Sequence, residues 1–279
     1  MNATKQLEKD AMRMLKLTSR TFYIPITLLE KDMKHAVASA YLCMRAVDEI
    51  EDHPDLNNDT KAHLLRGTAA LLCEDTFNRS AYDALTAGFK DYLPHVTLRL
   101  ADWLDVCPEG AKPKVKESTS IMAGGMASWT DKNWHIETEE DLDDYTYYVA
   151  GLVGVMLSDI WEWYDGTKTD YQLAIGYGRG LQTVNILRNQ DEDAERGVSF
   201  VPDGWSRADL FHYAETNLAK GDAYLKDIQN RSITLFCNIP LALAKKTLKA
   251  LRDGREKISR DEVEQTVEDI KSRTGTHDT

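Results

Sequence analysis

Apolar residues recur at helical spacing through almost the whole chain, and few helix-breaking residues interrupt them. The 279 residues include only 7 Pro and 16 Gly, and 42% of the chain is hydrophobic. Ala, Leu, Glu and Lys are abundant, and these residues have high helix propensities. The pattern predicts an all-α fold of long helices joined by short turns, and no internal repeat is found.

Short polar segments and Pro residues divide this pattern into predicted helices. The predicted helices cover residues 6–17, 31–50, 60–73, 79–92, 95–104, 114–130, 142–163, 171–195, 207–228 and 232–252, with a last short helix in the charged tail at 253–279. No stretch is rich enough in Pro, Gly or Ser to act as a domain linker. Residues 1–279 are therefore expected to form a single domain.

The chain is strongly acidic, with 46 Asp and Glu against 34 Lys and Arg and a net charge of −12. This charge repels nucleic acid and anionic lipid, so no nucleic-acid partner is expected. An anionic ligand would have to be held locally, by a few Arg side chains and by divalent cations bound to carboxylates.

The cysteines and the apolar runs indicate where the protein functions. The 4 Cys are far apart and show no paired spacing, and no export signal is found, so reduced thiols and a cytoplasmic location are expected. The longest apolar run, residues 145–160, is interrupted by Gly151, Gly154 and Asp159. No transmembrane segment is therefore expected.

The segment 48–52 concentrates acidic residues near the end of a predicted helix. Asp48, Glu51 and Asp52 have i, i+3 and i+4 spacing, so they share one helix face. Like charges this close repel unless a cation lies between them, and Mg²⁺ would relieve the repulsion. A solvated acidic helix end is the alternative interpretation.

A second polar face lies on the predicted helix 171–195. Asn185, Asn189 and Asp193 repeat every four residues and all carry oxygen ligands. Arg45 and Arg188 each lie within about one turn of a cluster, as expected of residues that contact phosphate oxygens. Ion pairing with neighbouring acids is the alternative for both Arg residues.

Several ordered motifs resemble those of the squalene/phytoene synthase family of trans-isoprenyl diphosphate synthases. The resemblance extends from about residue 17 to residue 248. The motifs are TSRTF (18–22), RAVDEIED (45–52), GMA (125–127), YTYYVAGLVG (145–154), LQTVNILRN (181–189) with Glu192-Asp193, Arg196-Gly197, FVP (200–202) and FCNIP (236–240). Together they are highly specific. The last looks like the eukaryotic-type squalene synthase version, whereas the absence of a C-terminal membrane anchor favours a bacterial-type enzyme.

The resemblance implies an isoprenoid-synthase helical bundle around a central apolar cavity, with assigned site residues. It implies metal ligands at Asp48, Glu51, Asp52, Asn185, Asn189, Glu192 and Asp193. It implies substrate contacts at Ser19, Arg20, Phe22, Tyr41, Arg45, Ala150, Gly154, Gln182 and Arg188. Tyr145, Asp48, Asp52 and Asp193 match catalytic positions.

Two of these assignments have alternatives in the sequence itself. Tyr147 and Tyr148 are as capable as Tyr145 of donating a proton, and only the motif register selects Tyr145. The small residues Ala150 and Gly154 would leave room for an isoprenoid chain against the helix backbone, but they would equally permit close helix packing.

The implied function is head-to-head condensation of two prenyl diphosphates, most simply farnesyl diphosphate, with Mg²⁺ as cofactor. The expected path runs through presqualene diphosphate to squalene or dehydrosqualene, with transient membrane contact to release the oily product. Use of NADPH stays open, because no dinucleotide fingerprint is found and residues 252–259 lack an Asn pair seen in eukaryotic-type enzymes.

The second motif departs from the family pattern at Asn189, where the family has Asp. A neutral carbonyl oxygen binds Mg²⁺ less tightly than a carboxylate, and Asp191 points about 200° away around the helix. This substitution favours an alternative, a single-substrate prenyl diphosphate phosphatase that forms farnesol, or a terpene cyclase. A non-catalytic helical interaction protein, in which both polar faces would be vestigial, is a third hypothesis.

Overall fold

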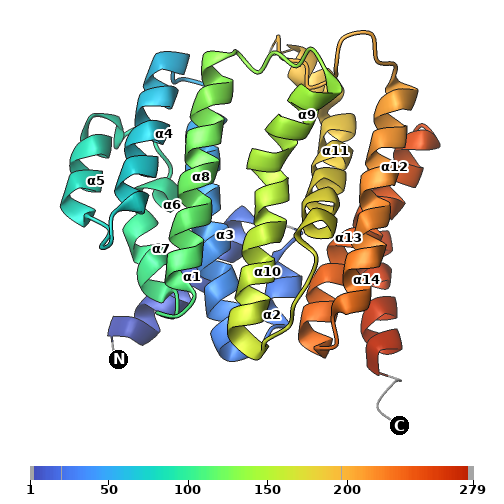
Figure 1. Ribbon diagram of the computed structural model, residues 1–279, viewed down its shortest axis with the longest axis horizontal. Coiled ribbons are helices and arrows are strands. Elements are labelled where there is room, and N and C mark those ends of the chain that lie inside the picture. The colour runs from blue at the N-terminus through green and yellow to red at the C-terminus, as the bar shows by residue number, and fades with distance from the viewer. Residues whose placement is uncertain (1–2, 20, 196, 276–279) are drawn as a thin grey trace. The chain divides into compact units, whose positions relative to one another are not determined.

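The computed structural model describes residues 3–19, 21–195 and 197–275, and these residues form helices and no strand (Figure 1). The helices are α1 (Ala3–Thr18), α2 (Tyr23–Thr27), α3 (Lys31–Glu51), α4 (Asn58–Cys73), α5 (Arg79–Thr86), η1 (Ala87–Phe89), α6 (His95–Leu98), α7 (Leu100–Val106), α8 (Lys112–Asp131), α9 (Glu139–Thr146), η2 (Tyr147–Gly151), α10 (Leu152–Asp165), α11 (Tyr171–Glu195), α12 (Arg207–Tyr224), η3 (Leu225–Asp227), α13 (Arg231–Arg252) and α14 (Arg260–Gly275). The predicted all-α fold is confirmed.

The chain divides into two compact units. Unit 1 comprises Met1–Tyr23 and Lys31–Trp134, and unit 2 comprises Ile24–Glu30 and His135–Thr279. The single domain and the central apolar cavity remain predictions.

Unit 1 is built around α3. This helix packs against α1, α4, α6, α7 and α8, and α4 lies beside α8 (Figure 1). Much of its middle is buried, including Ala36, Ala40, Leu42 and Val47. A helix with so wide an apolar surface is stable only when that surface packs against other elements. The segment that carries the first acidic motif is therefore held by the rest of the unit.

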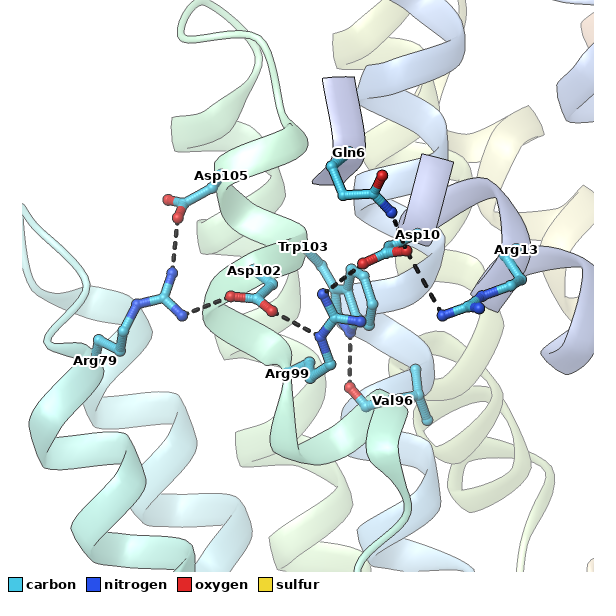
Figure 2. Close-up of polar contacts among 9 residues, drawn as sticks. All are labelled: Gln6, Asp10, Arg13, Arg79, Val96, Arg99, Asp102, Trp103 and Asp105. Atoms are coloured by element: carbon cyan, nitrogen blue, oxygen red, sulfur yellow. Dashed lines mark hydrogen bonds and ion pairs between the residues drawn. The ribbon is translucent and has the colours of Figure 1, made fainter. Parts of the chain in front are cut away.

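The predicted helix 95–104 is in fact two helices, α6 and α7, broken at Arg99. The Trp103 indole Nε1 donates to the Val96 carbonyl at 2.7 Å, an oxygen that a continuous helix would use for residue 100 (Figure 2). The Arg99 guanidinium lies over the Trp103 ring at 4.7 Å and pairs with Asp102 and Asp10. These side-chain contacts stabilise the break and attach α7 to α1.

Unit 2 is built around α11, which packs against α9, η2, α10, α12 and α13. The predicted helix 142–163 begins earlier, at Glu139, because Thr138 and Asp141 form a capping box. It is also interrupted by the π-helix η2 between α9 and α10. A π-helix widens the helical turn locally, and such segments are frequent at functional sites.

Candidate active site

The first acidic motif forms part of a continuous polar face on α3. Tyr41, Arg45 and Asp48 follow one another at three- or four-residue spacing along this helix, and Asp52 comes directly after its last residue, with its backbone N–H donating to the Asp48 carbonyl at 2.9 Å. The Arg45 guanidinium lies 3.5 Å from the Asp48 carboxylate and 2.5 Å from Glu49, so the ion pairing considered from the sequence is present. The Arg45 Nε is buried and has no hydrogen-bond partner among the described residues. This guanidinium therefore retains donor capacity for an anion.

The carboxylates of this face repel one another. Partial removal from water, together with the neighbouring Asp52, raises the pKa of Asp48 above its ordinary value, and Arg45 only partly offsets this rise. A divalent cation between the two carboxylates would offset their repulsion and favour the charged form of Asp48. The face is therefore chemically suited to Mg²⁺.

Glu51 occupies a different environment from Asp48. Its side chain is buried, its carboxylate accepts a hydrogen bond from Trp134 Nε1 at 2.8 Å, and its backbone carbonyl accepts one from Lys61 Nζ at 2.6 Å. Burial, and secondarily Asp52, raises the pKa of Glu51 to about 8. Its role as a metal ligand stays a prediction, and the contacts observed are with protein groups.

Among the described residues, no group of three or more His, Cys, Asp or Glu side chains is arranged to hold a metal ion. Mg²⁺ that binds together with a diphosphate typically uses one or two carboxylates and takes its remaining ligands from water and phosphate oxygens. A closed site made only of protein ligands is not required.

Predicted substrate residues gather beside the start of this face. The Ser19 hydroxyl accepts a hydrogen bond from the Phe22 backbone N–H at 2.9 Å, and the Phe22 ring lies 6.2 Å from the Tyr41 ring. The Tyr41 hydroxyl donates to the Thr18 carbonyl at 2.9 Å. The segment after α1 is thereby attached to α3 one turn before Arg45. Arg20 lies outside the described residues.

The second motif lies on α11, which is helical through Glu195, so Asn185, Asn189 and Asp193 do share one face. Arg188 Nε donates to the Asn189 side-chain oxygen at 3.2 Å. The remaining predicted residues of this helix are Gln182, which is half-buried, and Arg188 and Glu192, which are exposed. The face therefore presents two amide groups and one carboxylate where the family pattern would present two carboxylates.

Tyr145 differs from the two tyrosines that follow it. It is buried in the last turn of α9, and its ring stacks on Phe200 with centroids 4.8 Å apart and planes 16° apart. Tyr147 and Tyr148 are half-buried residues of η2 and contact each other edge to face at 5.4 Å. Only Tyr145 is therefore held in one orientation by a ring from the segment that follows α11.

Gly154 lies where α10 packs closely against α11. A Cβ added at Gly154 would lie 2.4 Å from the Ala174 carbonyl oxygen on α11, and one added at Gly178 would lie 2.4 Å from the Ala150 oxygen. Real Cβ atoms essentially never come so close to a backbone oxygen. Of the two interpretations of these small residues, the structure supports close packing at Gly154. Substrate contact at Gly154 and at Ala150 stays a prediction.

The FCNIP motif lies in the core of unit 2. Phe236 and Cys237 are buried, the Phe236 ring packs edge to face on Trp161 at 5.5 Å, and the Tyr177 hydroxyl donates to the Cys237 carbonyl at 2.5 Å. Phe236 and Cys237 therefore pack α13 against α10 and α11.

The comparisons with known proteins identify the class. The model of the squalene/phytoene synthase family matches residues 15–210, which is most of the chain. The chain belongs to the squalene/phytoene synthase family.

Individual relatives agree with this assignment. The chain is 28% identical to the squalene synthase of Homo sapiens over 274 residues, which cover 89% of this chain and 64% of the human protein. It thus spans less than two thirds of the length of that relative. Its fold is similar to TcSQS in complex with the ligand BPH1237, with a TM-score of 0.75, 21% identity, and coverage of 94% and 86% of the two chains. It is also similar to a dehydrosqualene synthase, with a TM-score of 0.61, 19% identity, and coverage of 98% of each chain.

No helix among the described residues has the length and apolar character needed to cross a membrane.

Proposed function

We propose that this chain catalyses the Mg²⁺-dependent head-to-head condensation of two prenyl diphosphates, with farnesyl diphosphate as substrate. The observation that carries the proposal is the polar face of α3, where Arg45 lies beside Asp48 and the repulsion between Asp48 and Asp52 favours a bound cation. The family match and the oxygen-rich face of α11 support the same reaction class.

The residues of α3 would promote departure of the diphosphate. Bound Mg²⁺ would supply neutralisation of the leaving group. Asp48 and Asp52 would hold the ion in unit 1. Within unit 2, Asn185, Asn189 and Asp193 are a second predicted set of metal ligands. Arg45 would exchange its 3.5 Å contact with Asp48 for phosphate oxygens, to which a guanidinium binds well.

Product analysis tests the proposal. Purified protein is incubated with farnesyl diphosphate and Mg²⁺, with and without NADPH, and the organic products are identified by mass spectrometry. Presqualene diphosphate, squalene or dehydrosqualene would support condensation, and the NADPH arm would show whether hydride is used. Farnesol or a C15 hydrocarbon as the sole product would contradict it.

The second candidate function is single-substrate hydrolysis to farnesol or cyclisation to a terpene, and the amide at Asn189 favours it. If the missing carboxylate limits condensation, Asn189→Asp will raise the ratio of coupled product to farnesol several-fold, because a charged oxygen binds Mg²⁺ more tightly. The measurement is the product ratio at fixed substrate and Mg²⁺. Asp191→Asn is the control, because Asp191 lies on another side of α11. If the ratio of coupled product to farnesol did not change in Asn189→Asp, the missing carboxylate would not be what limits condensation.

Tyr145→Phe is expected to lower the turnover rate about 10²- to 10⁴-fold, the range found when a proton-transferring group is removed. The variant keeps the ring that stacks on Phe200, so its melting temperature should change little. Steady-state kinetics and thermal unfolding measure the two effects. A large loss of rate in Tyr148→Phe, with none in Tyr145→Phe, would assign the role to the other tyrosine.

A further inference from the structure

Two consecutive residues after α8 have left-handed backbone conformations. Asn133 has a φ of 51° and Trp134 has a φ of 52°, although neither is Gly. Such a conformation is uncommon for Asn and an outlier for a bulky residue such as Trp. Asn58 on α4 supports this turn, since its Nδ2 donates to the Asn133 side-chain oxygen at 2.5 Å. Gly would adopt this backbone without strain, so the presence of Trp indicates that the indole has a function.

The indole contacts the acidic end of α3. Trp134 Nε1 donates to the Glu51 carboxylate at 2.8 Å, and the Lys61 ammonium lies 5.1 Å from the centre of the Trp134 ring. The same ammonium donates to the Glu51 backbone carbonyl at 2.6 Å. Glu51 and Lys61 are only 5% and 7% exposed. Both the side chain and the main chain of Glu51 are therefore held by groups that solvent does not displace.

Glu51 is the last residue of α3 and lies in sequence between the two aspartates of the motif. Carbonyl groups in the last turn of a helix lack intrahelical partners, so a helix end is free to fray unless other groups bind them. Lys61 satisfies one such carbonyl with a positive charge, which the helix dipole also favours. The backbone N–H of Asp52 still donates to the Asp48 carbonyl at 2.9 Å, so the helical spacing of the two carboxylates depends on this last turn.

We propose that Trp134 and Lys61 are positioning residues, which hold the end of α3 so that Asp48 and Asp52 present their carboxylates together to Mg²⁺ and a diphosphate. The inference rests on the proposed function of that face. Residues that orient metal ligands from behind commonly change metal affinity about 10- to 100-fold when they are replaced.

The test compares Trp134→Phe with the unmodified protein. Phe keeps an aromatic ring for Lys61 but has no N–H for Glu51. We expect the Mg²⁺ concentration for half-maximal activity to rise about tenfold, with turnover recovered at saturating Mg²⁺. A second readout is independent of the product: the rise in melting temperature caused by Mg²⁺ with inorganic diphosphate should require correspondingly more Mg²⁺. Lys61→Met, which keeps the aliphatic stem but lacks the ammonium, should shift both midpoints in the same direction.

Trp103→Phe is the matched control. Trp103 is buried in unit 1, whereas Trp134 is half-buried. Trp103 likewise donates its indole N–H, to a backbone carbonyl at 2.7 Å, and has a guanidinium over its ring, but it lies in the α1–α7 contact (Figure 2). The Trp103→Phe variant should be less stable than the unmodified protein, but the Mg²⁺ concentration that it needs for half-maximal activity should not change.

The outcomes separate the inference from the proposed function. An unchanged Mg²⁺ midpoint in both Trp134→Phe and Lys61→Met, with normal Mg²⁺ binding in the unmodified protein, would overturn the positioning role alone. Equal shifts in Trp103→Phe would also overturn it, because they would reflect general destabilisation. Absence of any Mg²⁺ and diphosphate effect on the unmodified protein would overturn both. Shifted midpoints in an enzyme that makes only farnesol would support the positioning role and contradict the condensation.

Discussion

Asp48→Asn is expected to lower Mg²⁺-dependent turnover about 10²- to 10³-fold while raising the melting temperature of the metal-free protein. The first effect follows because Asp48 is proposed to hold the cation, and a bound metal ion contributes several kcal/mol of charge stabilisation in the transition state. The second follows because burial and Asp52 disfavour the charged form of Asp48 in the folded protein. A neutral amide of the same shape does not carry that repulsion. Function and stability should therefore change in opposite directions.

Steady-state kinetics at varied Mg²⁺ and thermal unfolding without metal measure the two effects. Asp32→Asn is the control, since Asp32 is an exposed acid in the first turn of the same helix and should leave turnover unchanged. A variant Asp48→Asn that keeps full activity would remove Asp48 from the metal site. A lowered melting temperature would show that Asp48 stabilises the metal-free fold through its contact with Arg45.

Gly154→Ala is expected to destabilise the protein by about 2–3 kcal/mol, within the range for overpacked cores. The new Cβ would lie 2.4 Å from the Ala174 carbonyl oxygen, so α10 and α11 would have to separate. At about 2–4 °C per kcal/mol for a large domain, the melting temperature should fall by about 5–10 °C. Activity should fall as well, because α11 carries the second proposed set of metal ligands.

Gly124→Ala is the matched control. Gly124 also lies inside a helix, α8, but a Cβ there meets nothing within 4 Å. This substitution should stabilise the protein by about 0.5–1 kcal/mol, because Ala loses less conformational entropy on folding. If Gly154→Ala unfolded at the normal temperature but changed the chain length of the product, Gly154 would serve substrate binding, and the packing explanation would fail.

The helical spacing and the scarcity of Pro and Gly predicted the fold class and the positions of most helices. The departures have local causes that apolar spacing does not encode. The break at Arg99 depends on the Trp103 indole, which takes the Val96 carbonyl, and the π-helix η2 interrupts a segment whose apolar spacing is continuous. Both features depend on contacts and turns formed only in the folded chain.

The sequence by itself determined which oxygen-bearing residues share a helix face, because residues three or four apart lie together on any α-helix. The faces of α3 and α11 were predictable for this reason. Only the tertiary structure decided the environment of each residue. It placed Glu51 between Trp134 and Lys61, stacked Phe200 on Tyr145 and brought Gly154 against α11. These contacts join residues from 10 to 83 positions apart, as between Glu51 and Lys61 or Trp134, and no sequence period links such residues before the chain has folded.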